Sequence, residues 1–275
     1  MTPPTALQMS PEVLAGIVSM PLDRLTKISR AAHRLYIVSN LPKKDGGTRL
    51  IEAPYKSLGE IQHSLHKKVL SQVAVHEVLH GRPNTSQLTA AQVHVRQPMV
   101  VTMDVRNFFP SVTTTMILGA LKKAGFPKQT SEIITRLCTR KRRLPQGAPT
   151  SPVLSRIVVT PILHEIEKLV SSVSPHCRIT QFVDDLAISG PLGIHRLIPI
   201  VHKIWERHGF TIHPQKTKVM GRSKAQEVLG VWVNNRLEPT KDFLDRLADA
   251  KEKLPPNDLH RLGLESYHRS IINSG

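Results

Sequence analysis

The stretch "ITQFVDDLAIS", residues 179 to 189, places Asp184 and Asp185 side by side within a run of strand-forming residues. Successive side chains of a strand point to opposite faces, so these two acids can act together only where the chain turns. The stretch therefore predicts a tight hairpin with the acids at its tip. Two anions held this close raise each other's pKa unless a cation or a network of donors neutralises them. The pair requires a partner, such as a metal ion.

The composition favours a folded, basic protein. The 275 residues are 40% hydrophobic, which is enough to bury a core. An excess of 38 Lys and Arg over 21 Asp and Glu gives a net charge of +17, which favours a polyanion partner, nucleic acid foremost, over a merely solvated surface. No apolar stretch approaches the roughly 20 residues of a spanning helix, so no membrane attachment is expected. Cys138 and Cys177 lack zinc-ligand spacing, and the N-terminus lacks a secretory layout, which indicates reduced thiols and a cytoplasmic location.

The spacing of apolar residues predicts an alternation of helices and strands. Helices are expected at residues 11 to 40, 57 to 79, 113 to 138, 152 to 171, 194 to 208 and in the basic tail after 239. Strands are expected in a hairpin at 41 to 54, from 98 to 104, at 179 to 189, at 218 to 221 and within 227 to 239. This order fits an α+β fold in which helices cover one face of an antiparallel sheet.

Asp104 ends its apolar strand about eighty residues before the acidic pair. If that strand lies beside the hairpin, Asp104 and Asp184 converge, with Asp185 next to them. Three carboxylates without His or Cys make a hard oxygen site that suits Mg²⁺ or Mn²⁺ rather than zinc. Such a cluster can hold two ions ~3.5–4 Å apart, one activating an attacking hydroxyl and one steadying a leaving phosphate. Taken alone, Asp104 fits a strand-end cap equally well.

Three segments resemble, in order and spacing, motifs A, B and C of reverse transcriptases: "VVTMDVRNFF", "LPQGAPTSP" and "FVDDLAIS". In addition, "KKDGGTRLIEAP" resembles the basic fingers hairpin, "HPQKTKVM" resembles motif D and "VLGVWVN" resembles the primer grip. The resemblance covers most of the chain. It implies a right-hand polymerase with fingers, a palm whose antiparallel sheet is covered by helices, and a short helical thumb. The implied division is residues 1 to 97 for N-terminal helices and fingers, 98 to 235 for the palm, with 113 to 145 contributing to fingers, and 236 to 275 for a basic thumb.

The resemblance also implies the metal ligands. Asp104 and Asp184 would bind two Mg²⁺ ions, which Mn²⁺ could replace. Asp185 would complete the acidic cluster, and the Val105 carbonyl would offer a further oxygen.

Basic residues acquire phosphate-binding roles through the same resemblance. Lys43 or Lys44, together with Arg49, would grip the triphosphate of a deoxynucleotide, because ammonium and guanidinium groups are standard phosphate donors. Lys216 would give a proton or a charge to the departing pyrophosphate. Without the resemblance, Lys43, Lys44 and Arg49 would fit a solvated turn, and Lys216 would fit an ordinary surface lysine.

Motifs A and B would supply the rest of the nucleotide site. Gln146 and Gly147 would lie against the incoming nucleotide, with glycine allowing a close approach of the backbone. Phe109 would stand beside the sugar and exclude a 2′-hydroxyl, whereas Phe108 fits a core position. Trp232 is expected to pack within the primer-grip hairpin.

Among reverse transcriptases, the chain resembles the retron type most closely. Residues 86 to 94 resemble the retron helix Asn-Ala-x-x-His, with Ala90 in place of the Asn but with Ala91 and His94 kept. A retron Val-Thr-Gly element has a counterpart at residues 228 to 230, with Leu229 in place of the Thr. The residues expected to contact RNA are His94, Arg82, Arg142 and Arg143.

The resemblance implies a polymerase that copies a dedicated, structured non-coding RNA into nascent DNA. Its expected partners are this RNA, the nascent DNA, deoxynucleoside triphosphates and an effector protein, often within a phage-defence system. Two alternatives stay open. One is a phage-defence polymerase that makes untemplated or protein-primed DNA. The other is a non-catalytic RNA-binding scaffold with the same fold, against which the intact acidic cluster argues.

Overall fold

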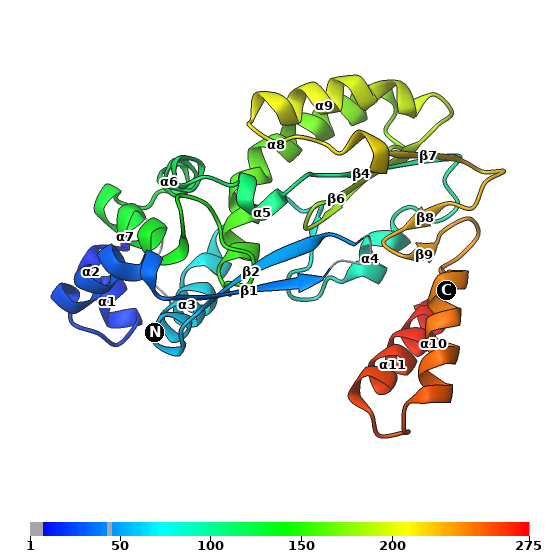
Figure 1. The fold of residues 1–275 in the computed structure, drawn as a ribbon. Coiled ribbons are helices and arrows are strands. Elements are labelled where there is room, and N and C mark those ends of the chain that lie inside the picture. Colours follow the sequence, from blue (N-terminus) through cyan, green and yellow to red (C-terminus); the bar gives the residue numbers. More distant parts are fainter. Residues whose placement is uncertain (1–7, 43–45, 275) are drawn as a thin grey trace. The chain divides into compact units, whose positions relative to one another are not determined.

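The computed structural model describes residues 8 to 42 and 46 to 274, which form two compact units (Figure 1). Unit 1 comprises Met1–His76 and Asn107–Pro161, and unit 2 comprises Glu77–Arg106 and Ile162–Gly275. The boundaries of these units differ from those of the predicted fingers, palm and thumb. The division into fingers, palm and thumb stays a prediction. None of the described helices is both long enough and apolar enough to cross a bilayer.

Unit 1 contains helices and one β-hairpin. Its elements are α1 (Pro11–Ile17), α2 (Leu22–Ala31), β1 (Tyr36–Pro42), β2 (Thr48–Pro54), α3 (Lys56–Lys68), α5 (Phe108–Ser111), α6 (Thr114–Lys123), α7 (Lys128–Cys138) and the first part of α8 (Ser151–Val173). Helix α7 packs against α1, α2, α3 and α6 (Figure 1). In α3, the Gln62 amide nitrogen donates to the Tyr36 hydroxyl over 2.9 Å and to the Leu137 carbonyl over 2.8 Å. One buried amide therefore joins α3 to the hairpin and to α7.

Two expected helices are shorter than predicted. The helix expected up to residue 40 ends earlier, because the aromatic and β-branched residues from Tyr36 favour a strand and form β1. The helix expected from 57 to 79 ends at Lys68 and is followed by the 3₁₀ turn Leu70–Gln72.

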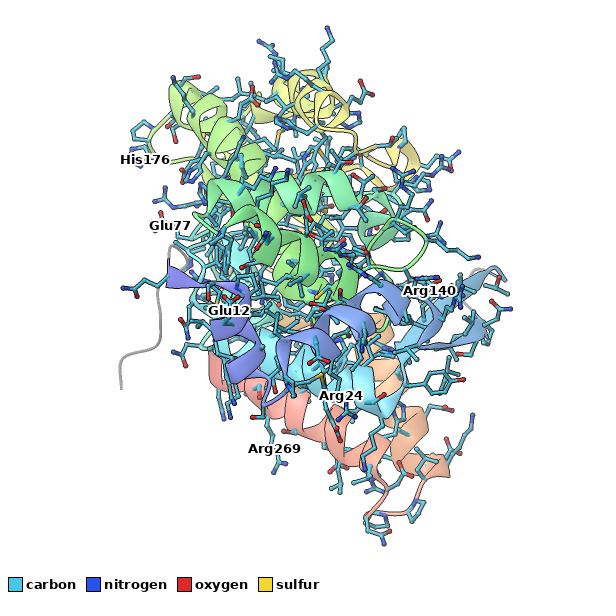
Figure 2. All side chains as sticks on the ribbon, turned by 90° about the vertical axis from the view of Figure 1, so that its left-hand side faces the viewer. Glu12, Arg24, Glu77, Arg140, His176 and Arg269 are labelled. Carbon is cyan, nitrogen blue, oxygen red and sulfur yellow. The ribbon has the colours of Figure 1, made fainter. Side chains whose placement is uncertain are left out.

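A buried ion pair fixes the hairpin of unit 1. Arg140 bonds to Glu52 of β2, and their side chains are 17% and 3% exposed. Figure 2 shows Arg140 beside the hairpin. The Glu52 amide also donates to the Gln146 carbonyl over 2.7 Å. The predicted nucleotide loop is thus attached to β2 through both the backbone and the ion pair.

Unit 2 is built on a five-stranded sheet of order β3-β5-β6-β4-β7. The strands are β3 (Leu79–His80), β4 (Met99–Asp104), β5 (Arg178–Phe182), β6 (Asp185–Gly190) and β7 (Lys218–Gly221). Neighbouring strands are antiparallel except β3 and β5, which are parallel, so the sheet is mixed and not purely antiparallel as expected. A smaller sheet joins β8 (Glu227–Val228), β9 (Val231–Trp232) and β10 (Glu238–Pro239).

Helices cover both faces of the larger sheet, whereas the sequence predicted cover on one. Strand β6 is buried at every residue after Asp185, and such burial on successive side chains requires cover on both sides. Figure 1 shows α9 (Ile198–Arg207) on one side and α4 (Gln87–Gln92) on the other.

The C-terminal helices share the core of unit 2. Helices α10 (Lys241–Lys253) and α11 (Leu259–Ser274) lie side by side in Figure 1. Phe243 and Ile271 from these helices belong to one buried cluster with Val100 of β4, Ala187 of β6 and Val231 of β9. The helical tail is therefore packed into the sheet domain.

His94 lies inside this unit and not on its surface. Its side chain is 0% exposed. One ring nitrogen lies 2.7 Å from the Ser189 hydroxyl of β6, and the other lies 2.7 Å from the Thr180 hydroxyl of β5. Burial, and secondarily His80, lowers the pKa of His94 to about 3, so the ring is neutral. The expected contact of His94 with RNA is wrong, because the ring's polar atoms are both used within the core.

Replacing His94 by Ala is expected to lower the free energy of unfolding by about 2–3 kcal/mol, because two buried hydroxyls lose their partner. Urea denaturation at pH 7.5 measures this effect. The matched control, exposed His33→Ala, should change the free energy by less than about 0.5 kcal/mol. Equal effects of both changes would contradict a structural role for His94.

The same histidine gives a pH dependence of stability. The pKa of His94 is about 3 in the folded protein, against an ordinary value of 6.5. Between these two pH values, the unfolded chain holds a proton at His94 that the folded protein lacks. The free energy of unfolding should therefore fall as the pH falls from 6.5 towards 3. This slope should be shallower in His94→Ala, and identical slopes would show that the imidazole is not buried in neutral form.

Candidate active site

The acidic pair lies at a hairpin turn, as the sequence predicted. Strand β5 ends at Phe182 and β6 begins at Asp185, so Val183 and Asp184 form the turn. Val183 has φ of 57°, a left-handed conformation that costs a residue with a Cβ about 1–2 kcal/mol. The hairpin maintains this strained turn through its antiparallel pairing on both sides.

The pairing of β4 with β6 brings the third acid to the turn. Asp104 lies directly opposite Asp185 in the ladder. The Val105 amide donates to the Asp184 carbonyl over 2.9 Å, and the Asp104 carbonyl accepts from the His213 amide over 2.7 Å. Backbone bonds thus hold both acidic segments at the same end of the sheet, and the predicted convergence of the carboxylates is confirmed.

The electrostatics of the cluster are those of crowded anions. Loss of hydration, followed by repulsion from Asp184 and Asp104, raises the pKa of Asp185 to about 7. The Asp185 side chain reaches solvent, yet it stands in a concave site whose walls displace part of its water. A bound cation would remove the repulsion and restore the ordinary ionised state.

Two lysines accompany the acids. The Lys216 ammonium lies 3.0 Å from an Asp104 carboxylate oxygen, with side-chain exposures of 56% and 17% respectively. Lys218 pairs with Glu227 over 3.3 Å. Sequence analysis identified Lys216 but missed Lys218 and Glu227. The alternation of the two lysines in "KTK" was the available signal, since alternate residues lie on the same side of an extended chain.

These side chains line a concave site of about 470 Å³ in unit 2. Its lining includes Asp104, Asp185, Lys216, Lys218 and Glu227, with the backbone turn of the β8–β9 hairpin at its rim. No His or Cys occurs among the described residues that line it. Such an all-oxygen donor set fits Mg²⁺ or Mn²⁺.

The residues expected to bind the nucleotide belong to unit 1. Arg49 is exposed on β2, and Lys43 and Lys44 lie outside the described residues. Phe108 is buried at 4% exposure, whereas the neighbouring Phe109 is half-buried, with ring centroids 5.5 Å apart. Phe108 therefore occupies the core position that was expected, and the sugar-facing role of Phe109 stays a prediction.

Gly147 also has a structural reason to be glycine. Its φ is 119°, and a Cβ there would lie 3.0 Å from Ile51 of β2. Any side chain would press on the hairpin, so this position requires glycine whether or not a nucleotide binds.

The arginines expected to bind RNA differ in their surroundings. Arg82 is half-buried, and its guanidinium donates to the carbonyls of Leu79 and Glu77 over 3.0 and 3.2 Å. Arg142 is exposed at a tight turn with φ of 62°. Arg143 is half-buried, with its Nε atom inside unit 1. Arg142 is therefore the one of the three whose side chain is most open to solvent.

Comparison with known proteins agrees with this geometry. The family model described as "Reverse transcriptase (RNA-dependent DNA polymerase)" matches residues 41–233. The retron Mx65 reverse transcriptase of Myxococcus xanthus is 30% identical over 84% of this chain and 59% of its own length. The retron Mx162 reverse transcriptase of the same organism is 29% identical over 82% and 53%. The retron Ec86 reverse transcriptase of Escherichia coli is 25% identical over 74% and 63%. The chain thus spans about half to three fifths of these relatives.

Solved structures support the fold. A telomerase from Candida albicans has a TM-score of 0.56 at 11% identity, covering 92% of this chain and 60% of that one. A foamy viral protease-reverse transcriptase has a TM-score of 0.50 at 21% identity, covering 86% and 38%. With a family model matching well over half of the sequence and three acids meeting on adjacent strands, the chain belongs to the reverse transcriptase family.

Proposed function

We propose that this protein is an RNA-directed DNA polymerase that adds deoxynucleotides to a growing DNA strand. The observation that supports this most is the meeting of Asp104, Asp184 and Asp185 at one end of the sheet. A fold that serves only to bind RNA has no use for three crowded carboxylates, because their repulsion destabilises the folded state.

The donor set fits two Mg²⁺ ions, with Mn²⁺ as a substitute. Asp104 and Asp184 would bind both ions, with Asp185 and the Val105 carbonyl as further oxygens. When bound, such ions activate a hydroxyl nucleophile and stabilise the leaving phosphate. Family membership supports divalent metal ions in general, and the raised pKa of Asp185 supports a cation at this cluster.

Lys216 would serve the leaving group. In the structure its ammonium neutralises Asp104. A metal ion at Asp104 would take over that neutralisation and free Lys216 to give charge or a proton to pyrophosphate. Arg49, Lys43 and Lys44 would hold the triphosphate, with Gln146, Gly147 and Phe109 around the nucleoside.

We further propose a retron-type enzyme that copies one structured RNA in the cytoplasm and acts with an effector in phage defence. The support is the similarity to three proteins named as retron reverse transcriptases. The counterpart of the Val-Thr-Gly element forms a turn with φ of 52° at Leu229 and 79° at Gly230. A positive φ is uncommon for leucine. The chain nevertheless turns here, with Leu229 in place of the usual Thr.

Asp184→Asn tests the catalytic assignment. The change keeps the side chain's shape but removes a ligand charge, so DNA synthesis should fall by orders of magnitude while RNA binding largely survives. Primer extension and filter binding measure the two quantities. Equal loss of both would identify a structural carboxylate, and normal synthesis would end the polymerase assignment.

Phe109→Ala tests the sugar-facing role. Phe109 is half-buried, and the proposed role places its ring beside the sugar of the nucleotide. We therefore expect its loss to relax discrimination against ribonucleotides more than it lowers deoxynucleotide use. The ratio of kcat/KM for the two sugars measures this. The control is buried Phe108→Ala, which should destabilise the fold by about 3–5 kcal/mol and leave the ratio unchanged.

Asp185→Asn tests the crowding of the anions. The folded pKa of about 7 exceeds the ordinary 3.8, so Asp185 contributes most to stability below pH 3.8, and this contribution is lost as the pH rises through 7. The metal-free variant should therefore have a higher Tm than the wild type at pH 8 but not at pH 4. Thermal unfolding in EDTA measures this.

Adding MgCl₂ at pH 8 should narrow the difference in Tm, because a cation stabilises the wild-type cluster. The control is exposed Asp245→Asn on α10, which should leave Tm unchanged at both pH values. A wild-type Tm for Asp185→Asn in EDTA at pH 8 would contradict repulsion within the cluster.

A further inference from the structure

Unit 2 contains a second concave site, which is larger than the acidic one. It measures about 810 Å³, within the ~300–1,000 Å³ of small-ligand sites. Its walls come from the segment around α4, from the end of β5 and from α11. We call it the α4–α11 pocket.

The α4–α11 pocket is lined chiefly by uncharged polar and aromatic side chains. Phe182 and Tyr267 supply two rings, and Gln87 and Gln92 supply amides. Among the described residues that line it, Arg82 is the one that carries a charge, and its guanidinium already bonds to two backbone carbonyls. In a chain of net charge +17, this lining is unsuited to grip phosphates and suited to base edges, ring faces and sugar hydroxyls.

A glycine leaves room for the ring of Phe182. Gly81 has φ of 77°, and a Cβ there would lie 3.1 Å from the ring of Phe182. With glycine at this position, the ring can line the pocket without displacement.

The α4–α11 pocket is preformed and adjoins the acidic site. Leu88 of α4, Phe243 of α10 and Ile271 of α11 belong to one buried cluster, and Tyr267 packs against it. The walls are thus parts of a single core. Gln87 lines both the α4–α11 pocket and the acidic site, so the two sites share part of their wall.

From these observations we propose that the α4–α11 pocket binds an unpaired nucleoside of RNA. The rings would stack on the base, as aromatic side chains do on single-stranded nucleic acid, and the amides would hydrogen-bond to its edges. Serine and threonine hydroxyls of the lining would meet the ribose 2′-hydroxyl. The inference rests on the proposed RNA-directed function and adds a site that distinguishes an RNA loop from duplex.

Photo-cross-linking tests the site directly. The probe is a single-stranded RNA of mixed sequence with 4-thiouridine at alternate positions, and mass spectrometry maps the cross-linked peptides. We expect cross-links at Phe182 or Tyr267 that disappear in Ser270→Trp, where the indole fills the pocket. Ser266→Trp, on the same helix but outside the lining, should retain them.

A second pair of variants guards against misfolding of the tryptophan variant. Gln92→Ala removes an exposed amide of the lining and should lower the yield of these cross-links at least threefold. Gln72→Ala removes an exposed amide of unit 1 and should not. Unfolding temperatures of all four variants verify that they are folded.

The outcomes separate this inference from the proposed function. Primer extension on a homopolymer template should be near normal in Gln92→Ala, and its absence in the wild type would overturn the polymerase instead. Cross-links that persist in both Ser270→Trp and Gln92→Ala would overturn the nucleoside site. Competition by double-stranded RNA as strong as by single-stranded RNA would overturn it as well.

Discussion

The repulsion among three carboxylates is the constraint on which the rest of unit 2 depends. Asp104, Asp184 and Asp185 would separate in an unconstrained chain, but the β4–β6 ladder and the bond from Val105 to the Asp184 carbonyl hold them together. The cost of this crowding is visible in the raised pKa of Asp185. The folded sheet must therefore supply the stability that the cluster removes, and a bound divalent cation would relieve the repulsion.

Burial around the cluster supplies that stability. Strand β6 is covered on both faces, and the hydroxyls of Ser189 and Thr180 both meet the ring of His94. The C-terminal helices add Phe243 and Ile271 to the same core. Two residues of the turns here have a strained backbone. Val183 directly precedes Asp184 in the β5–β6 turn, and Leu229 lines the acidic site. Strain at such turns is tolerated because well-packed strands flank them.

Much of this site could be predicted from sequence, because its signals are local. Adjacent acids within a strand pattern required a turn, and Asp104 at a strand end gave the third acid of the cluster. Long-range packing gave no such signal. His94 fits a family motif, yet only the pairing of β5 with β6 shows that two hydroxyls enclose it. The parallel contact of β3 with β5, the Lys218–Glu227 pair and the α4–α11 pocket likewise join residues far apart in the chain.

Counting bound Mn²⁺ by electron paramagnetic resonance tests most directly whether the acids form the cation site. The protein is titrated with Mn²⁺ at pH 8, and the signal of the free ion gives the number bound and the dissociation constant. Asp104→Asn is compared with Asp245→Asn, which changes an exposed acid of α10 that is distant from Asp104 in the sequence. The account predicts weaker binding by at least tenfold for Asp104→Asn and no change for Asp245→Asn. Equal affinity in the wild type and in Asp104→Asn would contradict it.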